Sequence, residues 1–294
     1  MTDAPAIRGG FRGRRSVLQV AWRAVRNAPT SAWFGMIVVL IYGLCAIFAP
    51  LIAPFGQGEI VGRAYLPSSA SFLLGTDQIG RDVFSRLIYG ARNTISIALA
   101  TTFISFTLGG TFGVLAALSR GWFDQVLSRM VDAILAIPVL IYALMLLAIF
   151  GKGVLNLIVI LAILDATRVY RLARATALNV VVMDFVEAAR LRGEKTRWIV
   201  FREILPNILP PLITEFGLRF CYVFLTISAL SFLGVGVQPP MADWGAMVAE
   251  NKTLITYGRP TPLYPAAAIA LLTISVNFTV DWFLDKSSGL RDEP

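Results

Sequence analysis

The chain has 294 residues, of which 56% are hydrophobic and 15% charged, and its formal net charge is +8. This much apolar surface excludes a single water-soluble core, and the absence of histidine removes the commonest general base and zinc ligand. The basic residues cluster between apolar stretches rather than along one polar face, so the sequence favours a membrane protein over a nucleic-acid-binding one.

Six stretches are apolar and long enough to cross about 30 Å of hydrocarbon as helices. They predict an all-α polytopic membrane protein with six transmembrane helices, at residues 33–52, 93–118, 126–150, 154–172, 208–233 and 263–284. The first stretch is longer than the hydrophobic region of a signal peptide, so we expect it to be retained. The second holds Gly109 and Gly113 at GxxxG spacing, which permits close helix packing.

The segments between the spans define the expected topology. Residues 1–31 and 286–294 flank a transmembrane domain at 32–285, with long outer loops at 53–92 and 234–262 and an inner loop at 179–206. If the N-terminus is inside, the inner segments hold 18 lysines and arginines and the outer segments hold 7. This bias predicts that both termini are cytoplasmic. Cys45 and Cys221 lie in apolar spans, so we expect neither a disulfide nor a metal site.

The inner loop "DFVEAARLRGEKTRWIVFREILP" at 184–206 predicts a helix, a turn and a second helix. Asp184 and Glu187 have capping-box spacing, and Gly193 can adopt the left-handed conformation that ends a helix. The second helix is expected to run from Lys195 to Pro206, with three apolar side chains on one side: Trp198, Phe201 and Leu205. Such a helix either docks into a partner's groove or lies on anionic lipid.

The pattern "EAA", three residues, glycine and then a gap to "LP" resembles the signature of binding-protein-dependent ABC importer permeases. The resemblance implies a coupling helix that docks into an ATPase subunit. The residues it assigns to this site are Glu187, Ala188, Ala189, Arg190, Arg192, Gly193, Glu194, Leu205 and Pro206. Glu203 departs from the pattern, which often has an apolar residue there.

Three further segments look like the C-type permease subunit of dipeptide, oligopeptide and nickel importers: "LGTDQIGRDVFSRLIYGAR", "ILPNILPPLI" and "LSFLGVGVQPPMADWGAMVAE". The resemblance implies a type I ABC importer permease fold in a bacterial inner membrane. Its implied partners are a second homologous permease, two ATPases and an extracytoplasmic solute-binding protein. The chain lacks a GxxxxGK[ST] phosphate loop, so we expect it to be non-catalytic and free of cofactors, with ATP and Mg on the ATPases. The tail departs from relatives at "LDKSS", and "GLRD" at 289–292 resembles their ending, displaced.

Charged residues inside the spans need partners or water. Glu215 and Arg219 are spaced to pair along one helix, Asp165 can reach Arg168, and Asp132 can meet the inner loop or water. A role in the translocation path stays open for all four of Asp132, Asp165, Glu215 and Arg219.

In the outer loops, Asp77, Arg81 and Asp82 either fix the loop or touch the binding protein. Trp244 is either an interfacial anchor or a docking residue. Two other functions compete with the permease: a stand-alone secondary transporter, and a membrane-embedded enzyme that uses Asp132 and Asp165 as a dyad.

Overall fold

The computed structural model describes residue 26 and residues 28–119 and 121–287. The arginines before Arg26 and the displaced "GLRD" element lie outside the described residues. Within them the chain forms helices joined by loops and two isolated β-bridges. In chain order the elements are α2 (Thr30–Ile47), α3 (Ala49–Ile52), α4 (Val83–Ser119), α5 (Trp122–Leu135), α6 (Val139–Phe150), α7 (Val154–Val181), α8 (Asp184–Leu191), α9 (Thr196–Ile199), the π-helical turn η1 (Val200–Ile204), α10 (Leu205–Phe232), α11 (Trp244–Asn251), the 3-10 helix η2 (Lys252–Tyr257) and α12 (Leu263–Ser287).

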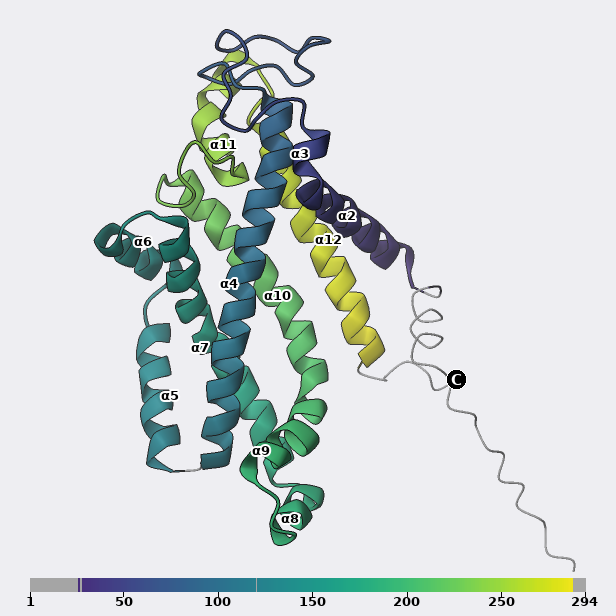
Figure 1. The fold of residues 1–294 in the computed structure, drawn as a ribbon, viewed down its shortest axis with the longest axis vertical. Coiled ribbons are helices and arrows are strands. Elements are labelled where there is room, and N and C mark those ends of the chain that lie inside the picture. The colour runs from purple at the N-terminus through teal and green to yellow at the C-terminus, as the bar shows by residue number, and fades with distance from the viewer. Residues whose placement is uncertain (1–25, 27, 120, 288–294) are drawn as a thin grey trace, which may run out of the picture.

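The longest helix, α4, has 37 residues and therefore extends about 55 Å along the molecule. At one end lies the cap, which we define as residues 53–82 together with α11 and η2 (Figure 1). At the other end lies the hairpin, defined as residues 182–204 with α8, α9 and η1 (Figure 1). Helices α5, α7 and α10 run beside α4 between these ends, and α2 packs on α12 at the side.

The close packing of α4 on α7 explains the two glycines of the predicted GxxxG pair. A Cβ atom on Gly109 would lie 2.4 Å from the carbonyl oxygen of Ala166, and one on Gly113 would lie 2.9 Å from the Cβ of Ala173. No side chain fits between the two backbones at either position. The prediction of close helix approach is confirmed, and α4 and α7 form the centre of the bundle.

Several predicted spans differ from the helices that form. Helix α4 begins at Val83 rather than at residue 93, and α7 continues to Val181 rather than ending at 172. The expected span 126–150 is two helices, α5 and α6, bent by 90°. The bend falls at Pro138, whose ring and missing N–H do not fit a helix interior.

Four helical segments in the described part of the chain are individually long and apolar enough to cross a membrane: α2, α4, residues 196–232 and α12. The bent pair α5 and α6 makes a fifth if it is one span. Helix α7 is long enough, but Asp165, Arg168, Arg171 and Arg174 make its second half polar. The expected count of six therefore depends on α7.

Candidate functional site

Helix α8 starts without the expected capping box. Its N-cap residue is Met183, and no side chain caps the first turn. Asp184 and Glu187 instead lie within that turn, where their negative charges interact favourably with the helix dipole. The capping-box prediction is wrong because the chain is already extended at Met183, which puts Asp184 one position too late to be the cap.

The end of α8 follows the prediction. Gly193 has a φ of +78°, in the left-handed region that glycine tolerates. Its N–H donates to the carbonyl of Arg190 at 2.9 Å, and the N–H of Glu194 donates to the carbonyl of Ala189 at 3.2 Å. These two bonds form a Schellman motif, which turns the chain sharply and fixes the position of α8 relative to α9.

Helix α8 is divided into a buried and an exposed face. Val186 and Ala189 are buried against α7 and α9, so Ala189 holds the helix in place rather than lying on its outer surface. The exposed residues of α8 are Asp184, Phe185, Glu187, Ala188, Arg190 and Leu191; Arg192 and Gly193, which follow the helix, are also exposed, while Glu194 is half-buried. Leu191 is 84% exposed and lies between the charged residues Arg190 and Arg192. Nothing in the sequence pattern singles out this leucine, although it lies between two predicted site residues.

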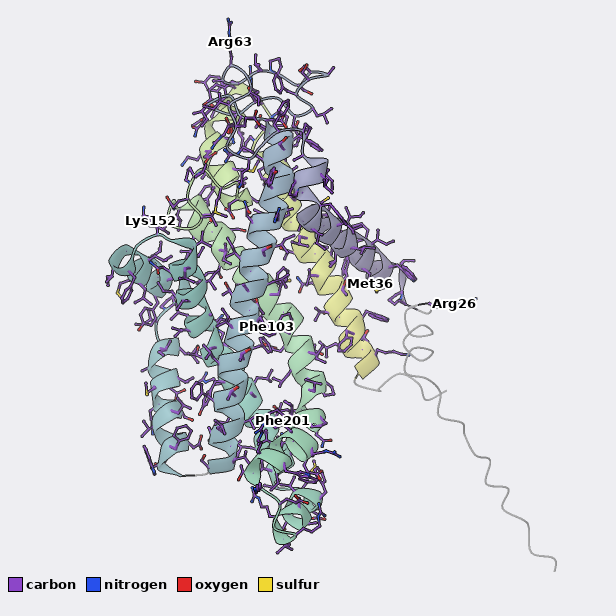
Figure 2. The ribbon with its side chains drawn as sticks, viewed as in Figure 1. Arg26, Met36, Arg63, Phe103, Lys152 and Phe201 are labelled. Atoms are coloured by element: carbon purple, nitrogen blue, oxygen red, sulfur yellow. The ribbon has the colours of Figure 1, made fainter. Side chains whose placement is uncertain are left out.

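The second half of the hairpin continues straight into α10. The expected apolar side at Trp198, Phe201 and Leu205 forms only in part. Trp198 and Leu205 are partly buried against the cluster that contains Ile199, Ile204 and Ile208, whereas Phe201 is 60% exposed. Figure 2 shows Phe201 at the hairpin end of the bundle. The π-helical turn shifts the register of the side chains. Pro206 does not end the helix, because it occupies the first turn of α10, where a missing N–H is tolerated.

Four charged side chains form a network where the cap meets α4; three of them are buried, and Glu250 is partly exposed. Arg81 lies 2.6 Å from Asp77 and 2.9 Å from Glu250, and Arg86 lies 3.2 Å and 3.0 Å from the same two carboxylates. Two positive and two negative charges therefore compensate one another away from water. The network joins the loop of residues 53–82 and the start of α4 to α11, so Asp77 and Arg81 stabilise this loop.

Asp82 and Trp244 also have structural positions. Asp82 caps α4 by accepting the backbone N–H of Ser85 at 2.8 Å. Trp244 is 1% exposed, and its indole N–H donates to the carbonyl of Leu87 at 2.9 Å. Its predicted roles as a membrane-interface anchor or docking residue are wrong, because the indole fills the space that the missing side chain of Gly90 leaves. Asp243 caps α11 through the N–H of Ala246, and burial raises the pKa of its carboxyl.

The charges within the bundle pair partly as expected. Glu215 lies 2.7 Å from Arg219, which confirms the predicted pair on α10. Asp165 does not pair with Arg168. It accepts a hydrogen bond from Ser105 at 3.0 Å and lies 3.7 Å from Arg219. The i, i+3 prediction fails because α10 brings a second arginine to the carboxylate.

Asp132 lies apart from both Asp165 and the hairpin. It pairs with Arg171 on α7 at 2.6 Å, and both side chains are about half exposed. The predicted contact with the inner loop does not form, since α5 lies against α7 instead. Asp165 and Asp132 have separate arginine partners, so the geometry gives no support to a carboxylate dyad.

Comparisons with known proteins agree with this architecture. Residues 109–288 match the family described as "Binding-protein-dependent transport system inner membrane component", and residues 16–67 match the "N-terminal TM domain of oligopeptide transport permease C". A di/tripeptide transport system permease protein, DppC, of Pseudomonas aeruginosa is 36% identical, covering 94% of this chain and 91% of its own. A glutathione transport system permease protein, GsiD, of Pectobacterium atrosepticum is 32% identical, covering 92% and 88%.

A solved structure shares the fold. The inward-facing MetNI methionine ABC transporter matches with a TM-score of 0.56 and 18% identity, covering 69% of this chain and 97% of the matched chain. At this identity the match shows the fold alone.

Proposed function

Because this chain belongs to the family of inner membrane components of binding-protein-dependent transport systems, and is thus a permease subunit of an ABC importer, we propose that its hairpin docks on a separate ATPase subunit. The observation that carries the proposal is the shape of α8. One face of this short helix is anchored in the bundle, and the other presents charged side chains around the exposed Leu191. A rigid helix tip of this kind fits a groove in a partner protein.

The Schellman turn supports the same role. A docking element that transmits force has to keep its orientation, and the two hydrogen bonds around Gly193 fix the link between α8 and α9. Leu205 and Pro206 belong to the start of α10, so they serve by carrying the hairpin on a continuous helix rather than by contact with the ATPase. ATP and Mg are then bound and ATP is hydrolysed by the partner subunits.

We infer a topology of six spans, with α7 as the sixth. Its charged half faces α5 and α10, where Arg171 meets Asp132 and Asp165 meets Arg219, so its charges are largely compensated inside the protein. With the hairpin on the cytoplasmic side, the excess of inner arginines and lysines supports the proposal that both termini are cytoplasmic. The cap then lies on the outer side, where a solute-binding protein delivers cargo. Figure 2 shows Arg63 projecting from its tip.

The proposed cargo is a small peptide, and a second permease completes the path. Peptide cargo is supported by the names of relatives that are 36% and 32% identical over nearly the whole chain. The second permease is proposed from the resemblance to importers with two homologous permeases; it and the lipid would together cover the large apolar side chains exposed along the bundle, among them Phe103, Leu108, Phe112, Ile141 and Phe150. The family to which the chain belongs supports an ABC importer permease rather than a stand-alone secondary transporter or a membrane-embedded enzyme.

Two substitutions test the docking role, with purification of the assembled transporter and ATP-driven uptake as readouts. Gly193→Pro breaks the left-handed turn, and Glu187→Arg reverses a charge on the exposed face of α8. Both variants should insert into the membrane, yet lose the ATPase subunit or uncouple its activity from uptake. Gly258→Pro is the matched control, because Gly258 has a φ of +68° and directly follows η2, at the end of the molecule opposite the hairpin. Unchanged ATPase retention and uptake in both hairpin variants would contradict the proposal.

A further inference from the structure

Arg168 is a charged residue in the middle of the bundle for which no ion pair or side-chain hydrogen bond forms within the described residues. It lies on α7, about 21 Å along the helix from Val154, and its side chain is exposed. An arginine within a span costs at least about 2.5 kcal/mol unless it reaches water or an anion. Its exposed position therefore needs an aqueous or anionic neighbour.

Two small recesses meet at this arginine. One lies between α6, α7 and α10, has a volume of about 20 Å³, and is lined by polar groups of Asp165, Tyr222 and Thr226. The other lies at the elbow between α5 and α6, has a volume of about 70 Å³, and is lined by Pro138, Tyr142 and Leu164. Arg168 and Val139 line both. Arg168 thus stands at the junction of the two recesses.

The neighbouring charges leave Arg168 available for a ligand. Asp165, three residues before it, is engaged by Arg219 and Ser105, and Glu215 is engaged by the same Arg219. A guanidinium presents planar donors that match a carboxylate, and Arg168 has all of its donors unused by described residues. A recess of about 70 Å³ holds a carboxylate with a few waters and is too small for a whole peptide.

We propose that Arg168 binds the carboxylate group of the transported solute as the solute passes along the bundle. This assignment rests on the proposed function, since it needs a carboxylate-bearing cargo such as a peptide. The competing role is structural: Arg168 lies beside the last turn of α5, whose carbonyl groups also favour a cation. A structural arginine would change stability, whereas a solute-binding one changes the response to a carboxylate.

The test uses the complete transporter with its binding protein, and dialanine and dialanine amide as probes. The variants are Arg168→Gln, Arg168→Lys and, as a matched control on the same helix, Arg171→Gln, which loses only an exposed pair with Asp132. Uptake per ATP hydrolysed should fall about tenfold or more in Arg168→Gln, because a hydrogen bond to a charged group is lost. Arg168→Lys should recover part of the loss, and Arg171→Gln should resemble the wild type.

A second measurement removes the binding protein and follows the thermal unfolding midpoint of the purified, nucleotide-free complex. Dialanine should raise the midpoint of the wild type and of Arg168→Lys, dialanine amide should raise neither, and Arg168→Gln should respond to neither probe. Equal uptake and an equal dialanine response in Arg168→Gln and the wild type would overturn the assignment. It would also be overturned if Arg168→Gln had a lower midpoint than the wild type without ligand and this loss of stability accounted for its lower uptake. Absence of ATP-driven dialanine uptake by the wild type would instead overturn the peptide cargo, and the role of Arg168 with it.

Discussion

Adding one methyl group at Gly109 should show how much the tight packing of α4 on α7 contributes to the free energy of unfolding, apart from the effect of helix propensity. Replacing either Gly109 or its neighbour Gly110 by alanine favours the helix by up to about 1 kcal/mol. At Gly110 no heavy atom lies within 4 Å of the new Cβ, so Gly110→Ala is the matched control. At Gly109 the Cβ would lie 2.4 Å from the Ala166 carbonyl oxygen and 2.7 Å from the Cβ of Val169. Neither atom is the end of a flexible side chain.

The two variants should therefore differ by the cost of overpacking, about 1–3 kcal/mol, because the gain in helix propensity cancels between them. The assay is equilibrium unfolding of the isolated subunit in mixed micelles, with helix content followed by circular dichroism. Gly110→Ala should be as stable as the wild type or more so, and Gly109→Ala clearly less stable. Equal unfolding free energies for the two variants would refute the close contact of α4 with α7.

Three further predictions concern the cap. Trp244→Ala should lower the free energy of unfolding by about 3–5 kcal/mol, measured by the same assay, while Trp122→Ala at a site 78% exposed should change it little. Arg86→Met should lower the free energy of unfolding by about 3–5 kcal/mol, because the carboxylates of Asp77 and Glu250 lose a cation. The cap should then be cut more readily in limited proteolysis, whereas Arg63→Met at the exposed tip should leave the digestion pattern unchanged. Burial raises the pKa of Asp243 in the folded protein. Its contribution to stability is therefore full below the ordinary carboxyl pKa of about 4 and is lost as the pH rises through the folded pKa. The unfolding midpoint of Asp243→Asn, measured against pH, should lack this decline.

Much of the helical organisation follows from local features of the sequence. Long apolar stretches predict α2, α10 and α12 to within a few residues, and Gly193 predicts the turn of the hairpin. The start of α4 could not be predicted in the same way. Its first turns carry Ser85 and Arg86, which look like loop residues until the partners that bury them are known.

The cap network and the bundle charges show why those partners escape a single sequence. Glu250 bonds to Arg81 and Arg86 across separations of 169 and 164 residues, and no periodicity connects such positions. For Asp165, local spacing pointed to Arg168, and the tertiary neighbour Arg219 took its place. A rule based on spacing identifies groups that can meet, whereas the fold decides which of them do.

The hairpin connects α7 to α10, the two helices that carry the paired charges Asp165 and Arg219. The buried side of α8 packs in one apolar cluster with Val180 of α7 and Ile208 of α10, so a displacement of α8 is transmitted to both helices through close-packed side chains. Farther along, Asp165 on α7 and Arg219 on α10 are joined at 3.7 Å, a longer contact than the 2.7 Å pair within α10. Relative movement of α7 and α10 must change this contact first, because the shorter pair moves as one body. Arg168 is carried on the same turn of α7 as Asp165, so a displacement of α8 by the proposed ATPase partner would shift the proposed solute contact along with the ion pair.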